Sequence, residues 1–109
     1  PRREFLHVDD LAAACLHLLR TYDAPEPINV GVGEDLTIAE LAALIADVVG
    51  YAGRIAWDTS KPDGTPRKLL DVGPIHALGW RAAVPLRDGI AATVAWYREH
   101  VVGTNVRSA

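Results

Sequence analysis

Short strand-like segments alternate with helical segments along this chain of 109 residues. The segments 4–8, 28–32 and 54–58 are rich in residues that favour strands, and they are separated by stretches with apolar residues at helical spacing. This alternation predicts an α/β fold. Three short strands form a poor independent sheet. We therefore expect the first two strands to complete a sheet whose other strands lie outside this sequence.

The first predicted helix follows two acidic residues. Asp9 or Asp10 is expected to cap it, because a carboxylate accepts the free amides of a first helical turn and suits the positive end of the helix dipole. The apolar residues that follow at helical spacing define the face that we expect to be buried: Leu11, Cys15, Leu18, Leu19 and Tyr22. Cys15 on this face is interpreted as an inert buried thiol rather than a nucleophile.

The start of the second helix has a specific signal. Thr37 and Glu40 have the spacing of a capping box, in which each side chain accepts the other residue's backbone amide. Gly50 is expected to end this helix. One or two helical turns are predicted over 74–78, and a last helix over 87–101.

Composition excludes several classes of protein. Half of the residues are apolar, which is typical of a globular protein, and the single cysteine excludes an internal disulfide. The longest apolar runs are too short for a transmembrane helix. A net charge of −3 argues against a general nucleic-acid or anionic-membrane binder. The sequence has no methionine and begins with strand-like residues, so we interpret it as a fragment of a longer protein.

Motifs for cofactors and metals are weak. Gly31-Val32-Gly33 after a predicted strand resembles the start of a dinucleotide fingerprint, but Leu36 stands where the third glycine is needed. A turn between strand and helix is the favoured interpretation. The sequence has no GxxxxGK[ST] phosphate loop. Its four histidines are dispersed without metal-ligand spacing, so a zinc site is not expected: His7, His17, His76 and His100.

Basic residues are concentrated in two short stretches. The segment 54–68 has four basic and two acidic residues (four minus two, a local charge of +2), although the whole chain is acidic. In the loop 61–68, Gly64 allows close backbone approach, Lys68 and its neighbour Arg67 offer charged donors, and Asp63 could accept from sugar hydroxyls or a base N–H. These properties fit a site for a small anion. A solvated charged loop fits them equally well.

Two segments carry a resemblance to a known family. Residues 2–12, Arg-Arg-Glu-Phe-Leu-His-Val-Asp-Asp-Leu-Ala, resemble a segment of the extended short-chain dehydrogenases that lies late in the nucleotide-binding domain. Residues 57–72, including Lys-Pro-Asp-Gly-Thr-Pro-Arg-Lys, and the later Leu78-Gly79-Trp80 closely resemble the GDP-L-fucose synthases. Members of that family are NADP-dependent enzymes that epimerise and reduce GDP-4-keto-6-deoxy-D-mannose.

The resemblance implies a GDP-sugar site and a division of the chain. Matching the family motifs residue by residue places substrate contacts at Arg3, Asp63 and Lys68. It implies that 1–33 is the partial end of the nucleotide-binding (Rossmann) domain and that 34–103 is the small substrate-binding domain. The remaining residues, 104–109, are expected to be a frayed tail. The family is cytoplasmic, uses NADP and commonly forms homodimers.

The family's catalytic motifs have no counterpart in this sequence. Its glycine-rich NADP motif, catalytic serine and YxxxK pair precede the matched region. The positions four residues after Tyr22, Tyr51 and Tyr97 hold Glu26, Ile55 and Val101 rather than lysine. We therefore predict that the chain alone has no catalytic residue, binds no NADP and is inactive without the missing N-terminal Rossmann portion. The alternatives are a fragment of another nucleotide-sugar epimerase or dehydratase, and a non-catalytic remnant.

Overall fold

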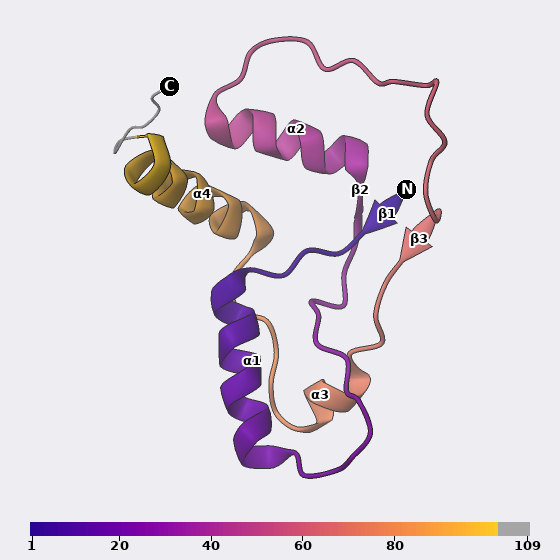
Figure 1. Ribbon diagram of the computed structural model, residues 1–109, viewed down its shortest axis with the longest axis vertical. Coiled ribbons are helices and arrows are strands. Elements are labelled where there is room, and N and C mark those ends of the chain that lie inside the picture. The colour runs from indigo at the N-terminus through magenta and orange to yellow at the C-terminus, as the bar shows by residue number, and fades with distance from the viewer. Residues whose placement is uncertain (103–109) are drawn as a thin grey trace.

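The computed structural model describes residues 1–102 (Figure 1). The sheet and helices along this part of the chain confirm the α/β class. In order, the elements are β1 (Arg2–Arg3), α1 (Val8–Thr21), β2 (Leu36–Thr37), α2 (Ile38–Val49), β3 (Arg67–Lys68), α3 (Gly73–Ala77), α4 (Leu86–Tyr97) and the π-helical segment η1 (Arg98–Val102). The predicted tail 104–109 lies outside the described residues.

The sheet is small, and β1 is its central strand. β1 pairs antiparallel with β2 and parallel with β3. The predicted strand over 4–8 is wrong, because pairing ends at Arg3 and α1 already begins at Val8. The predicted strands over 28–32 and 54–58 are also absent from the described residues. Apolar residues of the first two segments pack instead against the hydrophobic core: Leu6, Ile28 and Val30.

The start of α1 differs from the prediction. His7 is its N-cap, and the Nδ1 atom of His7 accepts a hydrogen bond from the Asp9 amide at 3.2 Å. Asp10 does not cap the helix. Its side chain is buried, and its carboxylate accepts from the backbone amides of Ala83 at 3.1 Å and Val84 at 2.9 Å. Asp10 therefore fixes the segment before α4 against the first turn of α1.

The buried face of α1 is also shifted from the predicted one. Asp10 and Ala14 are its buried residues, whereas Cys15 is exposed and Leu19 is 82% exposed. On the inner face, the Nε2 atom of His17 lies 2.7 Å from the carbonyl oxygen of Leu78. Asp10, Ala14 and His17 thus lie on the inner side of α1. Leu18 of the predicted face packs against the core, whereas Cys15 and Leu19 face outward.

The local helix signals are confirmed. Thr37 Oγ1 accepts from the Glu40 amide at 3.0 Å, and Glu40 Oε1 accepts from the Thr37 amide at 2.8 Å. Gly50 ends α2 in the left-handed conformation with φ of 79°. α3 and α4 occupy the two remaining predicted helical segments, and the end of the last one has π-helical geometry.

The hydrophobic core lies between α1 and α3. In the described part of the chain it consists of four buried residues, Ala14, Val72, Ile75 and Trp80. A second unit is formed by α2 and α4, which pack together at the other end of the molecule (Figure 1). The radius of gyration is 17.1 Å, whereas a compact domain of this length has about 13 Å. The fold is therefore open. No helix within residues 1–102 is long and apolar enough to cross a membrane.

Candidate anion-binding site

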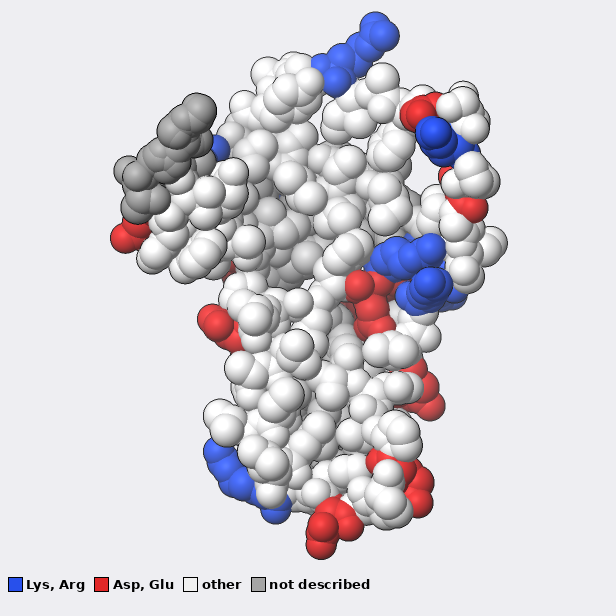
Figure 2. All heavy atoms as spheres, in the orientation of Figure 1, with Lys and Arg blue, Asp and Glu red and all other residues white. Residues whose placement is uncertain are grey.

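The pairing of β1 with β3 brings together the two basic stretches of the sequence. Arg2 lies opposite Arg67, and Arg3 lies opposite Lys68. Since successive side chains of a strand point to opposite faces, Arg2 and Arg67 share one face and Arg3 and Lys68 share the other. Figure 2 shows blue Lys and Arg side chains beside red carboxylates where these strands lie.

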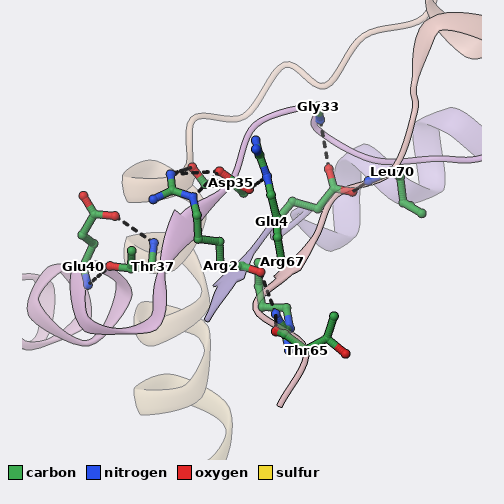
Figure 3. Close-up of polar contacts among 10 residues, drawn as sticks. Arg2, Glu4, Gly33, Asp35, Thr37, Glu40, Thr65, Arg67 and Leu70 are labelled. Atoms are coloured by element: carbon green, nitrogen blue, oxygen red, sulfur yellow. Dashed lines mark hydrogen bonds and ion pairs between the residues drawn. The ribbon is translucent and has the colours of Figure 1, made fainter. Parts of the chain in front are cut away.

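The face with Arg2 and Arg67 has a bound carboxylate. Arg2 Nε donates to Asp35 Oδ1 at 3.0 Å, and Arg67 Nε donates to Asp35 Oδ2 at 2.6 Å (Figure 3). The side chain of Asp35 is only 4% exposed. The hydrogen bond from Arg2 is the main reason that the pKa of Asp35 lies below its ordinary value; partial burial opposes this shift and Arg67 adds to it. One carboxylate thus bridges β1 and β3.

The opposite face holds two cations without such a partner. Arg3 Nη1 donates to the carbonyl oxygens of Arg2 and Thr65, each at 2.7 Å. A side chain at Gly64 would bring a Cβ atom within 3.2 Å of Arg3 Nη2, so glycine lets the loop approach the guanidinium closely. Within residues 1–102, neither Arg3 nor Lys68 forms an ion pair. Their charges remain available to an anion.

The third predicted contact, Asp63, lies in a long exposed connection. Every residue from Gly50 to Asp71 is exposed, and 51–66 has neither helix nor strand. Asp63 directly precedes Gly64, the glycine that lies against the Arg3 guanidinium. The Asp63 carboxylate forms no hydrogen bond or ion pair within the described part of the chain. The structure therefore places Arg3 and Lys68 opposite each other on neighbouring strands and does not bring Asp63 into a hydrogen bond or ion pair with either of them within residues 1–102.

Glu4, the residue after β1, holds two neighbouring segments by hydrogen bonds. The sequence does not predict this role. The Glu4 carboxylate accepts three backbone hydrogen bonds, from Val32 at 3.1 Å, Gly33 at 2.9 Å and Leu70 at 2.8 Å. Figure 3 shows the bonds from Gly33 and Leu70. The carboxylate therefore joins the residue after β1 to the turn before β2 and to the segment after β3. A side chain at Gly31 would bring a Cβ atom within 2.8 Å of Glu4 Oε2.

The same contacts test whether the turn at 31–33 fits a dinucleotide. A bound pyrophosphate needs the free backbone amides of such a turn. Here the Val32 and Gly33 amides already donate to the Glu4 carboxylate, which is itself negative. The turn therefore does not fit a nicotinamide dinucleotide. Within residues 1–102, no group of three or more His, Cys, Asp or Glu side chains is placed to hold a metal ion.

The Asp35 ion pairs predict a pH dependence of stability. Because the folded-state pKa of Asp35 lies below its ordinary value of 3.8, the ion pairs stabilise the fold fully above that pH. The stabilisation is lost as pH falls through the folded-state pKa. Thermal unfolding of the wild type and Asp35→Asn, from neutral pH down to about pH 3, should therefore show a difference in Tm that shrinks only in acid. A difference that stays constant over this range would contradict the prediction.

Comparison with known proteins connects this geometry to a family. The model of the NAD dependent epimerase/dehydratase family matches residues 1–31. GDP-L-fucose synthase 1 from Arabidopsis thaliana is 54% identical over 101 residues, which are 93% of this chain and 31% of that protein. The chain is a homologue of the GDP-L-fucose synthases. The resemblance found in the sequence is thus confirmed, and the chain spans about a third of the length of the curated relatives it matches.

Solved structures agree with this relationship. A GDP-L-fucose synthetase from Naegleria fowleri superimposes with a TM-score of 0.85 at 30% identity, covering 95% of this chain and 33% of that one. A GDP-mannoheptose C4 reductase from Campylobacter jejuni, solved with NADP bound, has a TM-score of 0.77 at 36% identity, covering 89% and 32% respectively. NADP is therefore bound by a structural neighbour of this chain.

Proposed function

We propose that this chain is the C-terminal, GDP-sugar-binding portion of a GDP-L-fucose synthase. The complete enzyme would be an NADP-dependent 3,5-epimerase and 4-reductase acting on GDP-4-keto-6-deoxy-D-mannose. The observation that carries the proposal is the placement of Arg3 and Lys68 side by side on one sheet face, free of ion pairs within residues 1–102. Two unpaired cations on adjacent strands suit a diphosphate, and the homology to GDP-L-fucose synthases supports the GDP-sugar class.

Each of the three predicted contacts has a distinct role in this proposal. The planar guanidinium of Arg3 matches phosphate oxygens in two-point contacts, and Lys68 adds a compact positive charge. Asp63 accepts hydrogen bonds from sugar hydroxyls or from the N–H groups of guanine. In the complete enzyme NADP supplies hydride chemistry, and the residues that hold it belong to the portion of the relatives that this chain does not cover. The chain's own task is to bind and orient the substrate.

Titration of the purified chain with GDP and ADP by calorimetry tests the proposal. We expect GDP to bind and ADP to bind more weakly, because guanine and adenine offer different donors and acceptors while the diphosphates are the same. A circular-dichroism melt of the same sample establishes whether the chain unfolds cooperatively. A cooperatively folded chain that binds neither nucleotide would contradict the proposal.

Two alternatives predict other results in the same titration. A fragment of another nucleotide-sugar epimerase or dehydratase would keep the phosphate contacts of Arg3 and Lys68, so UDP would bind as well as or better than GDP. A non-catalytic remnant would bind no nucleotide. The small core, with four buried hydrophobic residues within residues 1–102, supports the second alternative, since a chain with so little buried apolar surface gains limited stability.

A further inference from the structure

We propose that Asp35 is a positioning residue for the anion-binding face. Its carboxylate bridges Arg2 of β1 and Arg67 of β3, and this bridge keeps Lys68 beside Arg3 on the opposite face of the sheet. Asp35 would not touch the ligand. The inference rests on the proposed GDP-sugar site, and it adds the group that assembles that site.

β3 needs such a tether because little else holds it. It is two residues long, it is exposed, and it follows an exposed connection of 51–66 without helix or strand. Such a short strand pair is weak by itself. In addition to the β1 ladder, β3 and its flanks are held by three hydrogen bonds: the Arg2 amide donates to the Pro66 carbonyl at 2.8 Å, Arg3 Nη1 donates to the Thr65 carbonyl at 2.7 Å, and the Leu70 amide donates to Glu4 at 2.8 Å. Within residues 1–102, the only side-chain ion pair that ties β3 to the rest of the fold is that of Arg67 with Asp35.

The bridge has the geometry of a strong contact. The two oxygens of Asp35 take separate partners, Arg2 on Oδ1 and Arg67 on Oδ2. The carboxylate itself is almost fully shielded from solvent, so the contact is screened less than an exposed surface pair. Arg3 lies on β1, and its Nη1 atom also bonds to the carbonyl oxygen of Arg2 on the same strand, so its place depends less on β3 than that of Lys68 does. Loss of the bridge should therefore displace Lys68 more than Arg3.

In Asp35→Asn, the loss of negative charge and the loss of the bridge to β3 predict opposite changes in GDP affinity. Asp35→Asn removes a negative charge near the site, and that electrostatic change by itself would strengthen the binding of an anion. Loss of the bridge instead frees β3 and weakens binding. The direction of the change in GDP affinity therefore distinguishes a positioning role from a purely electrostatic one.

The experiment compares GDP binding to the wild type, Asp35→Asn and Asp47→Asn by calorimetry at one ionic strength. Asp47→Asn is a matched control, because it removes the same charge from a carboxylate that pairs with Arg87 on α4, away from the sheet. We expect Kd for GDP to rise about five- to tenfold in Asp35→Asn and to stay within about twofold in the control. Tighter or unchanged binding by Asp35→Asn would overturn the inference.

A second comparison separates positioning from general destabilisation. If Asp35 acts through Lys68, adding Asp35→Asn to a Lys68→Ala variant should weaken GDP binding little further, because the group that it positions is already gone. Full additivity of the two substitutions would contradict the proposed route. A general loss of folded protein would produce such additivity.

Amide hydrogen exchange provides a readout that needs no ligand. Asp35→Asn should accelerate exchange in the segment 66–70, while exchange in α1 should remain as in the wild type. If the wild type failed to bind GDP, the proposed function would be wrong, and exchange would still decide whether Asp35 holds β3. Unchanged exchange in 66–70 would overturn the positioning role.

Discussion

Replacing Glu4 with alanine is expected to lower the free energy of unfolding of the chain by about 3–5 kcal/mol. Three backbone amides, those of Val32, Gly33 and Leu70, would lose a charged acceptor at once. Each donor left without a partner costs about 1–3 kcal/mol, and water can replace part of the loss at the exposed Leu70. A typical domain is stable by only about 5–15 kcal/mol, so this loss is a large fraction of the total free energy of unfolding.

Urea unfolding followed by circular dichroism measures this effect. Glu26→Ala is the matched control, because Glu26 is exposed and its side chain accepts no hydrogen bond within residues 1–102. The control should change the free energy of unfolding by no more than about 0.5 kcal/mol. A Glu4→Ala variant as stable as this control would show that the three amide contacts do not hold the sheet region together.

The helices whose signals lie within one turn of the chain were predictable from the sequence. The capping box of Thr37 and Glu40 and the left-handed Gly50 define α2 through contacts at most a few residues apart. The same is true of Gly79, which follows α3 with φ of 93°. Such signals act before any tertiary contact forms, so a sequence is enough to read them.

The strands and much of the buried face of α1 were not predictable, because distant residues determine them. The run 28–32 has strand composition, yet Ile28 and Val30 pack on the core, and within residues 1–102 no strand pairs with the run. The face of α1 is defined by Asp10 and His17, which bond to backbone groups near residues 78–84. Apolar periodicity shows that a helix face favours burial, but it does not show which segment of the chain will cover that face.

The site was predictable only in part. The basic loop and the family motifs identified Arg3 and Lys68, and the β1–β3 register places them opposite each other. The sequence does not predict the roles of Glu4 and Asp35, because in the sequence each resembles an ordinary surface acid. Their importance comes from partners about thirty or more residues away, such as Arg2 and Arg67 for Asp35. The assembly of the site therefore depends on two carboxylates that are not themselves predicted ligand contacts.

Arg3→Ala is expected to weaken GDP binding about ten- to a hundredfold, or roughly 1.5–3 kcal/mol. The substitution removes the group proposed to contact phosphate, and it also removes the hydrogen bond that ties β1 to the Thr65 carbonyl. The second effect needs its own test. Arg3→Lys keeps the charge but lacks the planar fork, so it should recover only part of the affinity if two-point phosphate contacts matter.

Arg54→Ala provides the control for charge. Arg54 is an exposed base in the same long connection, and its side chain forms no ion pair within residues 1–102. Removing it should change Kd for GDP by no more than about twofold, because an exposed, screened charge contributes little. If Arg3→Ala and Arg54→Ala had the same small effect, Arg3 would act only as part of the general positive charge. A large loss confined to Arg3→Ala would support the specific contact that its place beside Lys68 suggests.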